Sequence, residues 1–262
     1  MACGGALLLV GLVALLAPWL APEDPDRIQV GLRFASPGAG QWLGRDELGR
    51  EVLSRLIYGA RVSLGVGLSA SFGLTFLGVL LGAAAGFAGG KLDSLIMRTA
   101  DVLMCIPTTF LILALIAALG PSLANVILVI VLTGWTGIAR MVRAEVMSLK
   151  EREFVLAARA SGATQVRVLF KHVLPNAMAP VYVALTFGVA GAILMESGLS
   201  FLGLGVQPPT ASWGSLLSSG RENLSEAWWL VVFPGLAIFA VMMLVNQLGE
   251  SARRYFDPRG QA

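Results

Sequence analysis

Few side chains in this sequence could do chemistry, and they lie far apart. The one histidine, His172, has no second histidine, cysteine or carboxylate at the spacing of a metal site. Cys3 and Cys105 lie in apolar stretches without another cysteine at ligand spacing, so neither a disulfide framework nor a zinc site is indicated. A membrane-embedded hydrolase would need a nucleophile and a base, or clustered metal ligands, in its apolar segments, and we find no such set. We therefore expect no catalytic residue and no metal site.

Nucleotide chemistry is also not indicated. No phosphate-binding loop of the form Gly-x-x-x-x-Gly-Lys-Ser/Thr occurs in the sequence. The nearest approach, Gly89-Gly90-Lys91-Leu92, lacks the upstream glycine and the hydroxyl residue that would ligate magnesium. If the protein works with ATP, we expect another chain to hydrolyse it, and we expect no cofactor on this one.

The composition is that of a membrane protein. Hydrophobic residues make up 56% of the chain and charged residues 13%, against about 25% charged in a soluble domain, and the mean hydropathy is +0.77. The net charge of +3 could indicate an acidic partner. Membrane proteins, however, collect Lys and Arg in cytoplasmic loops for topological reasons, so nucleic-acid binding is disfavoured.

Apolar runs near or above the spanning length predict an all-α polytopic membrane protein with six transmembrane helices. They cover residues 1–22, 62–88, 94–119, 123–139, 176–195 and 228–248. The first run could be a signal peptide, but its start carries no positive charge, so we favour a retained helix and expect that a short native N-terminal tail is missing. Pro107 and Pro234 predict kinks within two runs. Small residues spaced along the second run predict close helix packing: Gly65, Gly67, Gly73, Gly78, Gly82 and Gly86.

The Lys and Arg residues predict the topology, because they favour the cytoplasmic side. Segment 140–175 holds Arg140, Arg143, Lys150, Arg152, Arg159, Arg167 and Lys171, and the tail holds Arg253, Arg254 and Arg259. This places both termini in the cytoplasm. Loop 23–61 argues against the assignment, since it would lie outside yet contains Arg27, Arg33, Arg45, Arg50, Arg55 and Arg61. Its acidic residues make it locally neutral, which lowers that cost: Glu23, Asp24, Asp26, Asp46, Glu47 and Glu51.

Charged residues near the ends of the apolar runs are candidates for a substrate path. Arg98 and Asp101 lie three apart on one helical face, where they can pair with each other, and a transport role for Asp101 is the alternative. Glu196 falls just beyond a spanning length from Asn176, so we expect it at the outer interface or a cavity mouth. There it would be solvated, or it would face a peptide ammonium or a metal ion.

Residues 153–175 form the most distinctive polar segment. Glu153 to Ser161 predicts a short helix of good helix formers that ends at Gly162. A second amphipathic helix is expected from Thr164 to Val173, ended by Leu174-Pro175. The small side chains of Ala157, Ala158 and Ser161 leave one face nearly bare. Such a face suits insertion into a groove of another protein, and the alternative is a helix lying on lipid headgroups.

This segment resembles the coupling motif of ATP-binding cassette importer permeases, which reads Glu-Ala-Ala, three residues, Gly, nine residues, Ile-x-Leu-Pro. Matching positions are Ala157, Ala158, Gly162, Leu174 and Pro175, whereas Leu156 and His172 stand where the Glu and Ile would be. These departures are similar to the form found in the dipeptide, oligopeptide and nickel branch. Segments 46–61 and 196–214 also resemble that branch, in particular the second, C-type subunit of its two paired permeases.

The resemblance implies a type I importer permease fold in the bacterial cell membrane, on a chain that is not itself an enzyme. It implies a heterodimer with a second permease, two cytoplasmic ATPases that hold ATP and magnesium, and an external substrate-binding protein. The implied substrates are dipeptides or oligopeptides, with nickel or a nickel chelate as the alternative. The implied ATPase-coupling residues are Glu153, Ala157, Ala158, Arg159, Gly162, Leu174 and Pro175.

On this resemblance the chain divides into three parts. Residues 1–22 are the first transmembrane helix, 23–61 an extracytoplasmic loop with an amphipathic helix, and 62–262 the core permease domain. The core holds five transmembrane helices, the coupling segment 140–175 and an extracytoplasmic segment 197–227. A secondary transporter is the alternative class, but it would usually show repeated halves and broken helices around midplane charges, of which these runs carry almost none.

Overall fold

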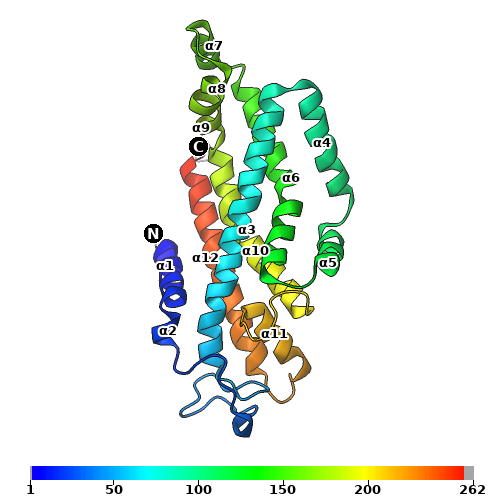
Figure 1. The fold of residues 1–262 in the computed structure, drawn as a ribbon. Coiled ribbons are helices and arrows are strands. Elements are labelled where there is room, and N and C mark those ends of the chain that lie inside the picture. Colours follow the sequence, from blue (N-terminus) through cyan, green and yellow to red (C-terminus); the bar gives the residue numbers. More distant parts are fainter. Residues whose placement is uncertain (1, 257–262) are drawn as a thin grey trace.

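The computed structural model describes residues 2–256, and within this range the chain forms helices joined by turns and loops, with no β-strand (Figure 1). The all-α class predicted from the apolar runs is therefore confirmed. The long helices are α3 (Val52–Ala88), α6 (Leu123–Leu149), α10 (Ala179–Phe201) and α12 (Trp229–Phe256). The shorter ones are α1 (Ala2–Leu15), α2 (Ala17–Leu20), η1 (Val30–Leu32), α4 (Gly90–Cys105), α5 (Thr108–Leu119), α7 (Glu153–Ala160), α8 (Gln165–Arg167), η2 (Val168–Val173), α9 (Leu174–Ala177) and α11 (Trp213–Glu222).

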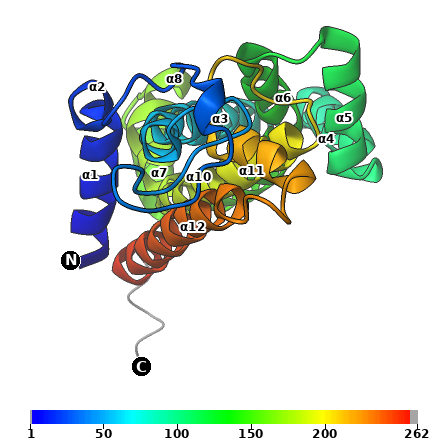
Figure 2. The ribbon, with the colours of Figure 1, turned by 90° about the horizontal axis from the view of Figure 1, so that it is seen from below.

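Helix α3 lies at the centre of the bundle and packs closely on α6 and α10, while α1 and the α4–α5 pair lie at opposite edges (Figure 2). Glycines allow the close approach of α3 and α6. A Cβ atom at Gly78 would lie 2.7 Å from the Cβ of Ile138, and one at Gly86 would lie 2.8 Å from the Arg143 carbonyl oxygen. Real Cβ atoms do not approach so closely, so these positions exclude larger residues. The predicted role in helix packing is thus found at the α3–α6 contact, but not at Gly65, where a Cβ atom would meet nothing within 4 Å.

Four of the described helices are long and apolar enough to cross a membrane: α3, α6, α10 and α12. The run predicted at 94–119 is α4 and α5, which are bent by 92° at Ile106 and Pro107 and count as a fifth span only if the pair is taken together. The run at 1–22 forms the 14-residue helix α1 and the short α2. At 1.5 Å per residue, α1 is about 21 Å long, short of a hydrocarbon core of about 30 Å. Among the described residues, four helices, or five spans with the bent pair, thus meet the criteria of length and composition, against the six spans predicted.

The two prolines differ in effect. The kink predicted at Pro107 is confirmed, because Ile106 and Pro107 separate α4 from α5. Pro234 lies inside α12, which is assigned as one helix from Trp229 to Phe256.

The bundle has two unlike ends. The protruding segment, residues 150–177, projects beyond the spans at one end, and α12 points the same way (Figure 1). The loop end, formed by residues 21–51 and by 202–228 with α11, lies at the other. Helix α3 begins at Val52, so the last ten residues of the predicted loop 23–61 are its first turns, and η1 is the helical turn before it. Arg259 of the basic tail lies outside the described residues.

Candidate functional site: the protruding segment and the charged residues of the bundle

The protruding segment begins with α7, whose end is fixed by backbone geometry. Gly162 has a φ of +83°, the left-handed conformation that favours glycine at a helix end. The amide of Ala163 donates to the Ala158 carbonyl at 3.1 Å, and the amide of Gly162 donates to the Arg159 carbonyl at 3.0 Å. The side chain of Thr164 then caps α8 by accepting from the Arg167 amide. The helix, glycine bend and second helix expected from the sequence are therefore present.

The second helix does not end at Leu174-Pro175 as we expected. After α8 the chain continues through the wide π turn η2 into α9, which ends at Ala177. Pro175 is the second residue of α9 and has no N–H to donate to the preceding turn. The side-chain amide of Asn176 donates to the His172 carbonyl at 2.6 Å and so satisfies an acceptor there.

One face of the protruding segment packs on the bundle and the other is left open. Val155, Val168 and Val173 are fully buried and belong to the main hydrophobic core. Large apolar side chains remain exposed along the segment: Phe154 (45%), Leu156 (47%), Val166 (68%) and Phe170 (61%). Neighbouring exposed apolar groups that are rimmed by polar residues mark interaction sites. The segment is therefore both anchored and unpartnered.

The predicted coupling residues are spread over this open face and its edges. Glu153, Ala157, Gly162 and Pro175 are exposed. Ala158, Arg159 and Leu174 are half-buried, because they face the bundle. The guanidinium carbon of Arg159 lies 5.9 Å from the centre of the Phe87 ring at the end of α3. This cation–π contact, and the bond of 3.1 Å from the Lys150 ammonium to the Gly86 carbonyl, tie the segment to α3.

Two ion pairs hold α4 to α6. Asp93 binds Arg143 through both carboxylate oxygens, and the bond to the Arg143 Nη2 measures 2.6 Å. Asp101 binds Arg140 rather than Arg98, so the predicted pair within α4 is wrong. The reason is the rotation of α4, which turns Asp101 toward α6, a neighbour that spacing along one helix cannot reveal. Asp101 is exposed, and its role in a substrate path stays a prediction.

At the loop end, three arginines that oppose the predicted topology are buried and paired. Arg45 bonds Glu23 at 2.6 Å. Arg50 bonds Asp46 at 2.7 Å, and Arg55 lies 3.5 Å from the same carboxylate. The hydrogen bond from Arg45 holds the pKa of Glu23 below its ordinary value. The charges of these arginines are thus compensated within the fold.

Glu196 is not solvated, and it does not face a cavity mouth, so that expectation is wrong. Its side chain is 0% exposed, and it accepts hydrogen bonds from the hydroxyls of Ser63, Ser197, Ser200 and Ser212. The sequence analysis missed these serines. Ser197 and Ser200 follow Glu196 at i+1 and i+4 and could have been found, whereas Ser63 lies 133 residues away.

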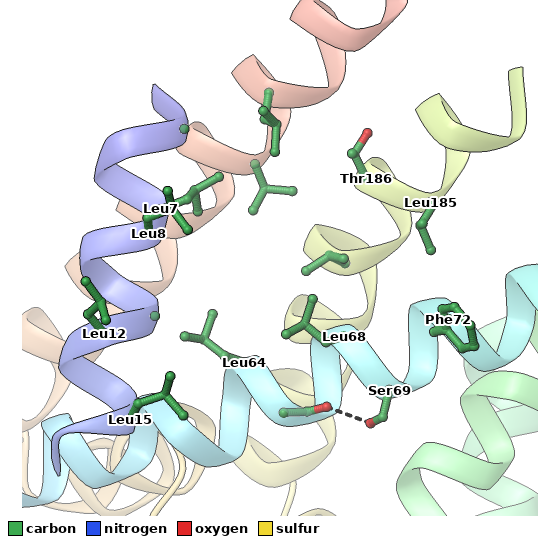
Figure 3. A pocket seen from close by; sticks show the side chains of 16 residues that line it. Leu7, Leu8, Leu12, Leu15, Leu64, Leu68, Ser69, Phe72, Leu185 and Thr186 are labelled. Atoms are coloured by element: carbon green, nitrogen blue, oxygen red, sulfur yellow. Dashed lines mark hydrogen bonds between the residues drawn. The ribbon is translucent and has the colours of Figure 1, made fainter. Parts of the chain in front are cut away.

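A cavity of about 1020 Å³ lies between α1 and the bundle (Figure 3). Its walls are mostly leucines, among them Leu8, Leu12, Leu64 and Leu68. The hydroxyls of its two polar residues already donate within their own helices, Ser69 to Gly65 and Thr186 to Val183. The lining of the cavity is therefore almost wholly apolar and suits neither a charged substrate nor ordered water. Among the described residues, no group of three or more His, Cys, Asp or Glu side chains could hold a metal ion.

A bundle of membrane-spanning helices with an anchored segment that projects from one end defines an integral membrane transport subunit. The family model described as "Binding-protein-dependent transport system inner membrane component" matches residues 78–260, well over half of the sequence. The chain belongs to this family. It is a multi-pass inner-membrane permease of the ATP-binding cassette importer class and not itself the catalytic subunit, as the resemblance in its motifs predicted.

Several curated proteins are similar over nearly the whole chain. A Di/tripeptide transport system permease protein DppC of Pseudomonas aeruginosa is 43% identical over 98% of this chain and 88% of its own length. A putative peptide transport system permease protein of Brucella suis is 43% identical over 97% and 85%. A nickel transport system permease protein, NikC of Escherichia coli, is 41% identical over 95% and 90%.

Solved structures share the fold. A chain of the inward-facing MetNI methionine ABC transporter superposes with a TM-score of 0.62 at 18% identity and covers 78% of this chain and 96% of its own. This likeness confirms the predicted type I importer permease fold.

Proposed function

We propose that this chain is the C-type permease subunit of an importer that carries dipeptides or oligopeptides across the bacterial inner membrane. The observation that carries the proposal is the similarity to permeases named for di- and tripeptide transport over nearly the whole chain. The similarity to a nickel permease is only slightly lower, so nickel or a nickel chelate is the second candidate substrate. In either case the imported species is cargo, and this chain supplies the path.

The proposed complex contains a second permease, two cytoplasmic ATPases and an extracytoplasmic binding protein. The protruding segment supports the ATPase part of this proposal. Phe154, Leu156 and Phe170 offer apolar contacts to a groove, while Ala157 and Ala160 keep the intervening surface shallow. ATP and magnesium are held by the ATPases, which supply the free energy for transport. The alternative of a secondary transporter is not favoured by the family match.

The orientation follows from this assignment. The protruding segment and the C-terminal end of α12 face the cytoplasm, where the ATPases lie. The N-terminus lies there too in this proposal, which takes α1 and α2 together as a first crossing of the membrane. Residues 23–51 and 197–227 then face the binding protein on the outside. The buried ion pairs of Arg45, Arg50 and Arg55 support this placement, because compensated arginines weigh less against an external loop than free ones.

The mechanism of coupling is mechanical. Movement of an ATPase groove displaces α7, whose buried Val155 and whose Arg159, stacked on Phe87, transmit the displacement to the core and to α3. The helical stretch from α8 to α9 passes it directly into α10, since only Met178 separates α9 from α10. Alternating closure of the two ends around the path then moves the substrate.

The test is affinity purification of the tagged chain from mild detergent after co-expression with its neighbours. Recovery of an ATPase subunit is expected, and Ala158→Arg should abolish it because the larger side chain faces both groove and bundle. Ala39→Arg, an exposed substitution at the loop end, is the matched control and should leave recovery intact. Uptake of a labelled dipeptide and of nickel by proteoliposomes then separates the two candidate cargoes. A chain that purifies alone, with Ala158→Arg having no effect on transport, would contradict the proposal.

A further inference from the structure

The carboxylate of Glu196 lies at the centre of a buried hydroxyl cluster near the loop end of α10. Its Oε1 accepts from the Ser200 hydroxyl at 2.7 Å and from the Ser212 hydroxyl at 2.8 Å. Its Oε2 accepts from the Ser63 hydroxyl at 3.3 Å and from the Ser197 hydroxyl at 3.5 Å. Among the described residues, no ion pair includes Glu196.

Three of these serines link the carboxylate to backbone amides of the loop end through hydrogen bonds. Ser63 of α3 accepts from the Trp213 amide at 3.1 Å. Ser200 of α10 accepts from the Val206 amide at 3.1 Å. Ser212, the N-cap of α11, accepts from the Ser215 amide at 3.1 Å as part of a capping box. Each hydroxyl accepts on one side and donates to Glu196 on the other.

This arrangement makes the carboxylate a shared acceptor for three separate elements. Each serine oxygen already accepts a backbone amide, so its proton is directed at Glu196. Removal of the carboxylate would leave buried hydroxyl protons without an acceptor, and networks of this kind fail together rather than bond by bond. Glu196 therefore fixes where residues 202–222, which we name the loop-end segment, sit on α3 and α10.

The loop-end segment packs closely on α10 and α3 at two glycines. A Cβ atom at Gly214 would lie 2.6 Å from the Cα of Ser197, and one at Gly59 would lie 3.2 Å from the carbonyl carbon of Ser212. The indole of Trp213 donates to the Leu56 carbonyl of α3 at 3.0 Å. Backbone and side chain of Trp213 are thus both bound to α3.

We propose that Glu196 is the positioning residue that fastens the loop-end segment to α10 and α3, so that this segment moves with α10. Its consequence for transport rests on the proposed function. Because α10 follows the protruding segment directly, displacement of that segment by an ATPase is carried through α10 to the loop end. A displacement caused by contact with a loaded binding protein is carried in the opposite direction, from the loop end through α10 to the protruding segment.

The first experiment measures amide hydrogen exchange on the complex of the full chain with its partner subunits in lipid nanodiscs. Glu196→Ala should raise the exchange of the Val206, Trp213 and Ser215 amides by about tenfold, a modest value for the loss of a buried hydrogen-bond network. Glu196→Gln, which keeps an acceptor oxygen, should give a smaller rise. Glu222→Ala removes an exposed carboxylate from α11 and is the matched control, with no change expected.

The second experiment measures ATP hydrolysis by the same complexes with and without loaded binding protein. Glu196→Ala should keep basal hydrolysis and lose the stimulation by the binding protein. The double variant Ser63→Ala and Ser212→Ala, which keeps the carboxylate but removes two of the linking hydroxyls, should reduce the stimulation in the same direction. This variant tests the proposal even if Glu196→Ala does not fold.

The outcomes separate the two levels of the proposal. Unchanged amide exchange in both Glu196→Ala and the double variant would show that Glu196 does not fasten the segment. Faster amide exchange with normal stimulation of ATP hydrolysis would show that Glu196 fastens the segment but that this link carries no displacement between the binding protein and the ATPases. An unmodified complex without an ATPase subunit would overturn the proposed function and the transmission with it, while the exchange data still decide the fastening.

Discussion

The protruding segment and the loop end both lie beyond the spans and both expose large apolar side chains, but they differ in whether they bury charged ones. The protruding segment exposes apolar groups such as Leu156 and Phe170, and the side chains that it buries are small apolar ones. The loop end also buries charged groups, Arg45, Asp46 and Glu51 among them, each at most 3% exposed. An exposed apolar face lowers the free energy of the system only when a partner covers it. A buried polar network is complete only when all of its members are present.

The difference implies that the two ends respond differently to substitution. At the loop end, the loss of one group leaves buried partners unsatisfied, so the folded state itself is destabilised. At the protruding segment, the loss of an apolar contact leaves the fold intact and weakens assembly.

Asp46→Ala should destabilise the protein by about 3–5 kcal/mol, the typical cost of breaking a buried ion pair from one side. The carboxylate accepts from Arg50 and from the amides of Leu48 and Arg50, and it lies near Arg55. Thermal unfolding in detergent measures the effect. Asp24→Ala removes an exposed carboxylate bound only to a nearby amide and should change the unfolding temperature little. Equal effects of the two variants would show that the buried ion pairs of the loop end stabilise the fold no more than an exposed carboxylate does.

Leu156→Asp should abolish recovery of the ATPase subunit while changing the stability of the chain by no more than about 0.5 kcal/mol, as for other exposed positions. Leu156 is 47% exposed on the proposed docking face. Leu224→Asp, at a 55% exposed leucine of the loop end, is the control and should leave assembly unchanged. Affinity purification with quantified subunit ratios distinguishes them. Loss of stability with retained assembly would reverse our assignment of the face.

Gly162→Ala should cost about 1–2 kcal/mol locally, because a Cβ atom is unfavourable in the left-handed conformation. The site has open space, so the cost is conformational and not steric. Gly137→Ala, in open space within α6 and at an ordinary helical φ, is the matched control and should be neutral or slightly stabilising. Protease sensitivity of residues 150–177 reports the change. Equal sensitivity in both variants would exclude a conformational role for Gly162.

The pair of Glu23 and Arg45 should give a small pH dependence. The folded pKa of Glu23 lies below its ordinary value of 4.5, so its contribution to stability is fully present above that value. The contribution is lost as the pH falls through the folded pKa. Unfolding temperatures of the unmodified chain and of Glu23→Gln, measured from pH 7 downward, should therefore converge in acid. A constant difference across that range would show that Glu23 does not stabilise the fold through its charge.

The sequence predicted the helical class and the helix, glycine bend and helix of residues 153–173, because periodicity, length and a terminal glycine are local signals. It did not predict which residues meet across helices. The pairing of Asp101 with Arg140 depends on the rotation of α4, and the burial of Glu196 depends on a segment that folds back over it. The continuation of the helix past Pro175 was missed because the π turn before it was not foreseen. The spacing of residues along the chain does not show which residues far apart in sequence come into contact.

The length of α3 has a consequence for the lipid. With 37 residues it is about 55 Å long, nearly twice a hydrocarbon core of about 30 Å. Its first turns are fixed to the loop end by Trp213, and its last turn is fixed to the protruding segment by Phe87 and Gly86. A helix held at both ends cannot adjust by sliding, so a change in bilayer thickness must be met by tilt. The distance between the protruding segment and the loop end is thus set by the protein. A thinner or thicker membrane instead alters the angle between α3 and the membrane normal.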